Sequence, residues 1–274
     1  MRWIERIADE SKTDFRELLL MGDEQWDQVT RYLWRGALFA LREDAETRAI
    51  ALVTQETEAI CEVKNLAVDP RWRRQGYGRA LLDFLAGWFC GRERTLLVGT
   101  GDAPGTLSFY RNCGFEPSHV VPNFFITHYD HPIIEDGQRL RDMVYLRKSL
   151  APQALEKLWV IQPNETGLLQ GMLRIFHEAV HVTCAKDYSP EQRAAWAPET
   201  LDEAAWAKRF AESQTRVAVN AQGEVLGFAN LEGDNYLDCL YVSPAAQGQG
   251  VGSALCATIE ALAVGDIEVR VSLT

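Results

Sequence analysis

The chain has 274 residues, 47% of them apolar and 24% charged, a composition typical of a globular protein large enough for two modest domains. Its 39 acidic and 28 basic side chains give a formal net charge of −11, which disfavours nucleic acid as a partner because such binding neutralises phosphates with basic groups. Residues 1–10 lack the apolar core of a signal peptide, and no segment reaches the roughly 18 consecutive apolar residues of a membrane span. We therefore expect a cytoplasmic protein without a membrane partner.

A strand, a glycine-rich turn and a helix are predicted around residue 76. Val68-Asp69-Pro70 precedes the run Arg73-Arg74-Gln75-Gly76-Tyr77-Gly78, named here the first glycine loop. Apolar residues then recur at the spacing of an amphipathic helix, at Leu81, Phe84, Leu85, Trp88 and Phe89. Glycines let an anion approach the free N–H groups at a helix start, so the loop is typical of a phosphate site. The Gly-Lys-Ser/Thr of a P-loop and the third glycine of a dinucleotide fingerprint are both missing from the sequence.

The same unit recurs further along the chain. Val242-Ser243-Pro244 precedes Gln247-Gly248-Gln249-Gly250-Val251-Gly252, the second glycine loop, at a constant offset of 174 residues. The apolar stripe of the following helix recurs at the same offset, with smaller side chains. Two copies of one strand–loop–helix unit are therefore predicted.

A domain boundary is predicted near residue 150. The stretch 147–156 is polar and contains Pro152, whereas 142–146 and 158–161 are apolar runs. In the second half, Asn220-Ala221-Gln222-Gly223 is typical of a hairpin loop. We predict domains at residues 1–150 and 151–274, and interleaved strands and helices in both predict an α/β (α+β) fold.

Phe109-Tyr110-Arg111-Asn112-Cys113-Gly114-Phe115 follows the first repeat. Together with the two glycine loops, this segment resembles the GNAT acetyltransferase superfamily, whose (Arg/Gln)-x-x-Gly-x-(Gly/Ala) and Phe-Tyr-x-x-x-Gly-Phe motifs it matches. The resemblance covers most of residues 15–150 and roughly residues 160–274. It implies two tandem GNAT-like domains, each a mixed, mostly antiparallel sheet flanked by helices, and acetyl-CoA (coenzyme A) as the cofactor.

The resemblance also implies where the coenzyme binds. The fourth strand should pair its backbone with the pantetheine arm, and N–H groups of the glycine loop should hold the pyrophosphate. Arg73 and Arg74 either add charge near the phosphates or are solvated surface side chains. The expected coenzyme-binding residues are Leu66, Ala67, Val68, Arg73, Arg74, Gln75, Gly76, Tyr77, Gly78 and Arg79 in the first domain, and Leu240, Val242, Gln247, Gly248, Gln249, Gly250, Val251 and Gly252 in the second.

Acetyl transfer to an amine requires a group that protonates the leaving thiolate and one that removes a proton from the amine. Tyr110 matches the family's acid; a phenol, with an ordinary pKa of about 10, is protonated at neutral pH. Packing alone is the other interpretation of Tyr110. Glu62, early on the fourth strand, is the candidate base, and a solvated strand edge is its alternative. Asp102, after the fifth strand, is expected to cap the next helix rather than contact the coenzyme.

The second copy ends early. A counterpart of Tyr110 would lie beyond Thr274, and the run 267–273 predicts a fifth strand with no helix or further strands after it. Such a sheet would keep an unpaired edge. Either the chain is truncated, or a second copy covers the edge as a homodimer, or the domain has a structural role. Catalysis is expected in the first domain.

His177-Glu178-Ala179-Val180-His181 matches the zinc-metalloprotease pattern. No convincing third ligand follows, and the six cysteines show no metal-ligand spacing. We expect a helix face or acceptor-site lining there, and no metal.

The sequence thus predicts an acetyl-CoA-dependent N-acetyltransferase in which a primary amine of a small molecule or peptide attacks the thioester directly in a ternary complex. The alternative is a non-catalytic acyl-CoA-binding protein that mediates assembly. The acceptor does not follow from the sequence, because acceptor loops vary within one fold.

Overall fold

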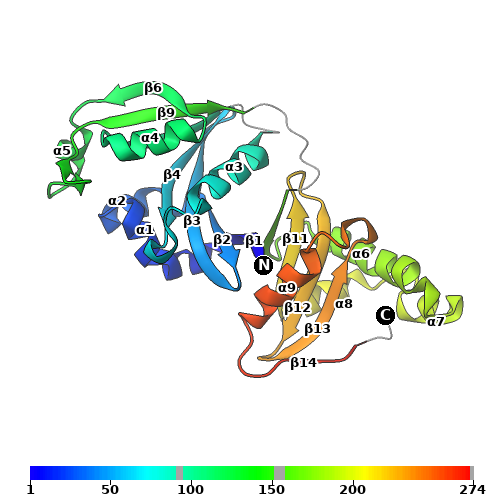
Figure 1. The fold of residues 1–274 in the computed structure, drawn as a ribbon. Coiled ribbons are helices and arrows are strands. Elements are labelled where there is room, and N and C mark those ends of the chain that lie inside the picture. Colours follow the sequence, from blue (N-terminus) through cyan, green and yellow to red (C-terminus); the bar gives the residue numbers. More distant parts are fainter. Residues whose placement is uncertain (91–94, 151–157, 272–274) are drawn as a thin grey trace. The chain divides into compact units, whose positions relative to one another are not determined.

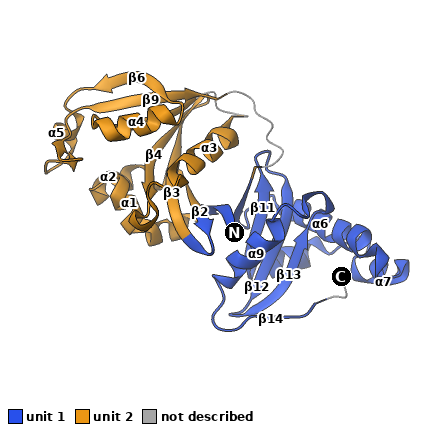
Figure 2. Ribbon diagram, viewed as in Figure 1, with its two compact units in different colours: residues 1–6, 42–46, 159–274 blue, residues 7–41, 47–158 orange. Residues whose placement is uncertain are grey.

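The computed structural model describes residues 1–90, 95–150 and 158–271 (Figure 1). The chain divides into two compact units (Figure 2). Unit 1 comprises residues 1–6, 42–46 and 159–274, and unit 2 comprises residues 7–41 and 47–158. Each unit contains a mixed set of hydrogen-bonded strands with helices against it, which confirms the predicted fold class.

Unit 2 contains one mixed sheet with the strand order β2-β3-β4-β5-β9-β6, and a separate small hairpin, β7-β8. The β3–β4, β5–β9 and β6–β9 pairs are antiparallel, whereas β4 and β5 are parallel. The strands are β2 (Ala37–Glu43), β3 (Glu46–Thr57), β4 (Ile60–Val68), β5 (Thr95–Gly101), β6 (Glu116–Val121), β7 (Ile134–Glu135), β8 (Gln138–Arg139) and β9 (Met143–Ser149). The helices are η1 (Asp9–Phe15), α1 (Arg16–Gly22), α2 (Trp26–Leu33), η2 (Pro70–Trp72), α3 (Tyr77–Phe89), α4 (Pro104–Asn112) and α5 (Phe124–His128).

The two faces of this sheet carry different helices. On one face, Leu19 of α1 and Leu33 of α2 pack with alternate strand residues such as Leu38 and Leu52. The opposite face carries α3, where Phe84 lies 6.1 Å from Phe39 between ring centroids. Leu81 and Leu85 are also fully buried, as the apolar stripe of the sequence predicts. The sheet is therefore covered by α1 and α2 on one side and by α3 on the other.

Two residues of the β3–β4 pair have no cross-strand partner. The register pairs Leu52 with Asn65 and Val53 with Val63, so Lys64 is an extra residue in β4. Closer to the loop that joins the two strands, the register skips Glu56 of β3. A β-bulge re-aims side chains, and a shift by one residue moves all later side chains to the other face.

Unit 1 contains a sheet with the order β14-β13-β12-β11-β10-β1. The pairs from β10 to β13 are antiparallel, and the outer pairs β13–β14 and β1–β10 are parallel. Its strands are β1 (Arg2–Ile7), β10 (Trp159–Pro163), β11 (Gln214–Asn220), β12 (Val225–Glu232), β13 (Tyr236–Val242) and β14 (Glu268–Val269). Its helices are α6 (Leu169–Val182), η3 (Thr183–Lys186), α7 (Pro190–Trp196), α8 (Glu203–Ala211), η4 (Pro244–Ala246) and α9 (Val251–Glu260).

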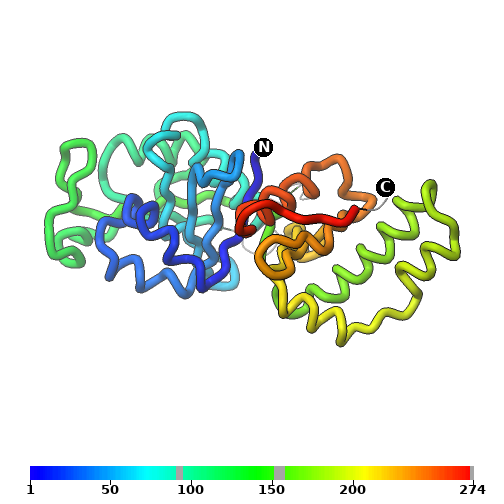
Figure 3. Tube along the Cα trace, turned by 90° about the horizontal axis from the view of Figure 1, so that it is seen from below, coloured from blue at the N-terminus to red at the C-terminus, as the bar shows by residue number. Residues whose placement is uncertain are grey.

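The core of unit 1 is also built on both faces of its sheet. Leu255 of α9 packs with Ala229 and its neighbours on one face. On the other face, Phe176 of α6 lies 5.1 Å from the ring of Tyr241, and Phe210 of α8 lies 5.5 Å from Phe228. Figure 3 shows the yellow-green helices α6 to α8 gathered on one side of the orange strands.

The repeat that the sequence predicts is present in the backbone. Gly76 has φ 87° and ψ 0° before α3, and Gly250 has φ 85° and ψ −2° before α9. The bulge recurs as well, because the β12–β13 register skips Asp238, which is 174 residues after Lys64. The predicted hairpin loop at 220–223 joins β11 to β12. The predicted strand at 267–273 is shorter than expected, since β14 covers Glu268–Val269 and residues 272–274 lie outside the described part. Among the described residues, no helix has both the length and the apolar character to span a bilayer.

Lys12 in η1 is a buried cation that closes the end of α2. Its side chain is 1% exposed, and Nζ donates hydrogen bonds to the carbonyl oxygens of Leu33, at 3.0 Å, and of Gly36. An ion pair with Asp9, at 2.7 Å, balances its charge. The last carbonyls of a helix have no partner within the helix, so Lys12 satisfies groups that burial would otherwise leave unpaired.

We expect the Lys12→Met variant to lower the free energy of unfolding by about 1–3 kcal/mol, because two buried carbonyls lose their donor. Urea unfolding followed by circular dichroism measures the change. Lys208→Met is the matched control, since the Lys208 side chain is 74% exposed and its ion pair with Glu212 lies at the surface. Equal stability of the two variants would show that Lys12 does not close α2 in solution.

Candidate active site

A cavity of about 490 Å³ lies in unit 2 between the end of β4, the first glycine loop and α4. Its lining consists of Met21, Leu66, Ala67, Val68, Arg73, Arg74, Gly76, Tyr77, Gly78, Arg79, Thr106, Phe109 and Tyr110. The structure thus brings together the predicted acid Tyr110 and every predicted coenzyme-binding residue of the first domain except Gln75. Three lining residues were not predicted: Met21, Thr106 and Phe109. Phe109 stands in the quoted Phe-Tyr motif, so for that residue a sequence signal was present.

The sheet opens beside this cavity. Pairing between β4 and β5 ends at Val63 and Val98, although β5 continues to Gly101. Beyond the bulge, residues 66–68 pair only with β3 and present their other backbone edge to the gap. An unpaired strand edge offers N–H and C=O groups to an extended ligand.

The first glycine loop has two residues in the left-handed region. Gly76 has φ 87° and Arg74 has φ 62°. The first hydrogen bond of α3 runs from Ala80 N to Gly76 O at 2.9 Å, so the N–H groups of the preceding turn have no helical acceptor. A Cβ at Gly78 would lie 3.3 Å from both Phe109 Cζ and Val68 Cγ2, so glycine allows the helix start to lie close against β4 and α4. The loop therefore places N–H groups that have no acceptor within the helix at the cavity wall.

The first residue of the glycine motif has the same contact in both repeats. Arg73 Nε donates to Val68 O at 3.3 Å, and Gln247 Nε2 donates to Val242 O at 3.4 Å. This hydrogen bond ties the loop to the last carbonyl of the preceding strand. Arg73, Arg74 and Arg79 are all exposed at the cavity, so the first loop also carries three positive charges.

Tyr110 lies in the last turn of α4 with its ring buried against aromatic neighbours. Its side chain is 6% exposed, and its centroid lies 5.1 Å from that of Phe109 and 5.7 Å from that of Phe115. Burial raises the pKa of Tyr110 above its ordinary value, with smaller contributions from the nearby Cys113 and Glu135. The phenol is therefore protonated throughout the physiological pH range and can act as a proton donor.

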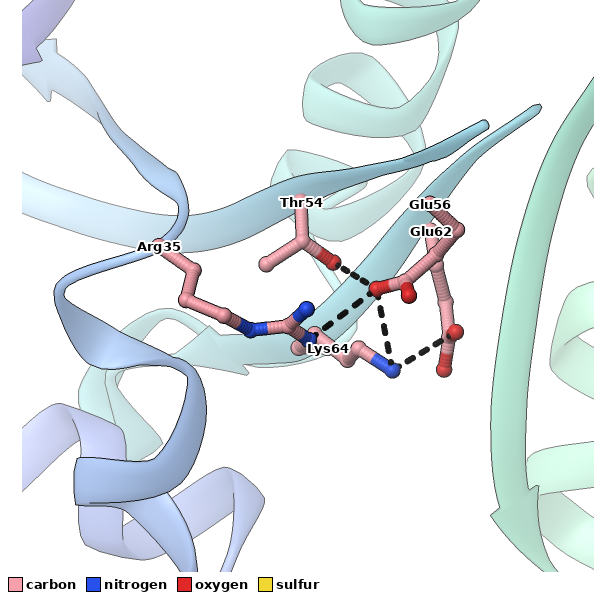
Figure 4. A network of polar contacts seen from close by, with 5 residues as sticks. All are labelled: Arg35, Thr54, Glu56, Glu62 and Lys64. Atoms are coloured by element: carbon pink, nitrogen blue, oxygen red, sulfur yellow. Dashed lines mark hydrogen bonds and ion pairs between the residues drawn. The ribbon is translucent and has the colours of Figure 1, made fainter. Parts of the chain in front are cut away.

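Glu62 lies outside this cavity, on the opposite face of the sheet. It pairs with Thr54, and Asn65 on the same face donates from Nδ2 to Leu19 O of α1 at 2.8 Å. The Glu62 side chain is buried and accepts a hydrogen bond from Lys64 Nζ at 2.7 Å (Figure 4). Burial raises the pKa of Glu62, and the contact with Lys64 opposes that rise. The predicted acid and base thus lie on the two faces of β4, on either side of the opening between β4 and β5.

Asp102 does not cap α4, contrary to the sequence prediction. Ala103 is the N-cap residue of α4 and makes no side-chain cap hydrogen bond. Asp102 Oδ1 instead accepts a hydrogen bond from Arg141 N at 3.2 Å. The carboxylate therefore tethers the segment before β9, a contact between residues far apart in sequence that local patterns do not reveal.

The two histidines of the zinc-like pattern lie on α6 with their rings stacked at 4.1 Å. His181 Nε2 contacts Ala197 O at 2.8 Å, which occupies one of its ring nitrogens. Across the described ranges, no group of three or more His, Cys, Asp or Glu side chains is placed to hold a metal ion. The segment is a helix face of unit 1.

Unit 1 has a smaller cavity of about 290 Å³ at the corresponding opening between β13 and β14. Its lining is Ala179, Thr183, Cys184, Trp196, Leu237, Asp238, Leu240, Tyr241, Val242, Gln247, Val269, Arg270 and Val271. Of the predicted second coenzyme site, Leu240, Val242 and Gln247 line it, but the rest of the second glycine loop, residues 248–252, does not. A Cβ at Gly250 would lie 2.6 Å from Met1 Cε, so Met1 packs against that loop.

The acetyltransferase (GNAT) domain family matches residues 34–117, and an acetyltransferase (GNAT) domain family matches again at residues 184–274. The uncharacterized N-acetyltransferase YvbK of Bacillus subtilis is 31% identical over 142 residues, which is 51% of this chain and 92% of that protein. The chain belongs to the GNAT acetyltransferase family. The tandem GNAT organisation that the sequence predicts is thereby confirmed.

Solved GNAT structures share the fold. A GNAT family acetyltransferase from Elizabethkingia anophelis with acetyl-CoA bound is 27% identical, with a TM-score of 0.52 over 54% of this chain and 98% of that chain. An acetyltransferase of Bacillus subtilis in complex with CoA is 31% identical, with a TM-score of 0.51 over 55% of this chain and 99% of that chain. Each of these proteins corresponds to about half of the present chain.

We expect Gly76→Ala to lower the free energy of unfolding by about 1–2 kcal/mol, because an L side chain is strained at positive φ and no atom lies within 4 Å of the new Cβ to offset the strain. Gly137→Ala is the matched control, with φ 77° and equally open surroundings in the β7–β8 turn. Urea unfolding should give similar losses for both. An unchanged midpoint for Gly76→Ala alone would mean that the loop does not adopt this conformation in solution.

Proposed function

We propose that the chain is an acetyl-CoA-dependent N-acetyltransferase whose reaction takes place in unit 2. A primary amine attacks the thioester carbonyl directly in a ternary complex, and no covalent enzyme intermediate forms. The observation that carries the proposal is the cavity that joins the first glycine loop, the open edge of β4 and Tyr110. The binding of acetyl-CoA and of CoA by two relatives supports the choice of coenzyme.

Different residues of the cavity bind different parts of the coenzyme. The free edge of residues 66–68 pairs with the amides of the pantetheine arm, as a further strand would. The N–H groups of residues 75–79 surround the pyrophosphate at the positive end of α3, and Arg74 and Arg79 add positive charge. Arg73 has a second role, because its hydrogen bond to Val68 O fixes the loop on the strand.

In the proposed reaction, the acid and the base act from opposite sides of the reacting carbonyl, which lies in the opening between β4 and β5. Glu62, on the α1–α2 face, takes the proton that the attacking amine loses, directly or through water. Tyr110, on the α3–α4 face, gives its proton to the CoA thiolate as the C–S bond breaks. The new bond is the amide N–C bond, and the products are the acetylated amine and CoA. The acceptor therefore enters from the α1–α2 face.

We infer that one coenzyme binds to each chain. The second glycine loop has the backbone of the first, but Gln247, Gly248 and Ser253 replace its three arginines, and Met1 packs against Gly250. Without those charges, the N–H groups alone face a ligand that carries several negative charges. Isothermal titration calorimetry of the full chain with acetyl-CoA should give one site per chain. An acetyl-CoA consumption screen over amines, amino acids, aminoglycosides and peptides then identifies the acceptor.

Tyr110→Phe should lower kcat by about 100-fold or more, because loss of a general acid leaves the thiolate to depart unprotonated. Binding of acetyl-CoA should change little, since the ring remains. Tyr236→Phe in unit 1 is the matched control and should keep wild-type kcat. Full acetyl transfer by Tyr110→Phe would rule out the acid role, and absence of coenzyme binding by the wild-type chain would rule out the proposed function as a whole.

A further inference from the structure

The two charged residues in contact beside Glu62 are the ones that the β3–β4 register skips. Lys64 is the extra residue of β4, and Glu56 is the extra residue of β3. Lys64 lies two residues from Glu62, and Glu56 lies two residues from Thr54, the cross-strand partner of Glu62, so the alternation of a strand places their side chains on the face of Glu62. A cation and a second carboxylate therefore stand beside Glu62 (Figure 4).

Lys64 Nζ bridges the two carboxylates. It lies 2.7 Å from Glu62 Oε2 and 3.3 Å from Glu56 Oε1, and its side chain is only 19% exposed. Glu56 is held in turn by Thr54 Oγ1, which donates at 2.6 Å, and by Arg35, at 3.2 Å. Each end of the network is therefore fixed, and the ammonium group has a defined position between two acids.

The charged and titratable groups that act on Glu62 come from four segments of unit 2. They are Lys64 on its own strand, Glu56 on β3, Arg35 before β2 and Tyr145 on β9. Burial, together with the charges of Glu62 and Glu56, raises the pKa of Tyr145 to about 12, so that phenol stays neutral. Although burial opposes it, the contacts with Thr54, Lys64 and Arg35 lower the pKa of Glu56, which keeps its charge. Lys64 is thus the cation in direct contact with the buried Glu62.

We propose that Lys64 is a positioning residue for the proposed reaction, one that holds the buried Glu62 carboxylate ionised and oriented so that it can take a proton from the amine. This inference rests on the proposed function, in which Glu62 is the base. Glu56 opposes Lys64 electrostatically but fixes it in place, so the two bulge residues set the basicity of Glu62 from opposite directions. Glu62 and Lys64 act as one pair, and replacing either residue disrupts the pair.

The test is the titration of Glu62 in the full chain labelled with ¹³C at the glutamate carboxyl carbons. The resonance absent from Glu62→Gln is that of Glu62. In Lys64→Met, loss of the adjacent cation should raise the pH at which Glu62 titrates by about one unit or more. In Glu56→Gln, loss of a like charge should lower it, while the amide oxygen can still accept from Thr54. Lys64→Arg should restore the wild-type value.

Lys148→Met is the matched control. The Lys148 side chain is 23% exposed and contacts Asp83 and Cys113 O, away from the network. In Lys148→Met, the Glu62 resonance should titrate at the same pH as in the wild type. The opposite signs of Lys64→Met and Glu56→Gln separate an electrostatic effect from general damage to the fold, and Glu56→Gln and Lys64→Arg keep the test decisive if Lys64→Met does not fold.

The inference would be overturned if the pH at which Glu62 titrates were unchanged in Lys64→Met and Glu56→Gln. It would also be overturned if that pH shifted in the same direction in these two variants. The proposed function is judged separately, by turnover with the amine that the screen selects. Loss of turnover in Glu62→Gln with no effect of Lys64→Met on the titration would keep the base and refute the role of Lys64. Full turnover in Glu62→Gln would refute the base itself and, with it, the positioning role.

Discussion

The one extra residue in β4 determines the geometry of unit 2. Because the register with β3 skips Lys64, Glu62 and Leu66 lie on opposite faces of the sheet, although an even spacing would place them on the same face of a regular strand. Pairing with β5 also ends at Val63, just before the bulge. One irregularity thus separates a polar network on the α1–α2 face from the cavity on the α3–α4 face, and marks where the sheet opens between them.

Unit 1 has the same β-bulge at Asp238, but the side chain at that bulge makes different contacts. Arg209 pairs with the Asp238 carboxylate, and Asn230 Nδ2 donates to it at 3.1 Å. The side chain at this bulge is thus bound by an arginine and an amide, whereas Lys64 contacts two carboxylates. Tyr236 stands at the position of Glu62, and the described part of unit 1 includes no helix that corresponds to α4. The backbone frame of the fold is therefore duplicated, whereas the groups suited to acid–base chemistry are found in unit 2.

Local chemistry made much of this protein predictable from its sequence. The two glycine loops were recognisable because positive φ and close packing at Gly76 and Gly78 restrict the residue type, and the helix stripe beginning at Leu81 because burial of one face sets its period. Features that depend on cross-strand register were not predictable. Nothing in the composition of β4 marks Lys64 as the extra residue, and the tether from Asp102 to Arg141 joins segments distant in sequence. The small hairpin β7–β8 was missed because its strands have two residues each.

The left-handed position before each glycine-capped helix is occupied by Arg74 in one loop and by Gly248 in the other, with φ of 62° and 74°. An arginine in this conformation is under torsional strain that a glycine relieves. Converting Gly248 to arginine would return a cation to the second loop at the expense of conformational stability, and converting Arg74 to glycine would do the reverse. Each of these single substitutions would exchange conformational stability of the loop for affinity toward anions.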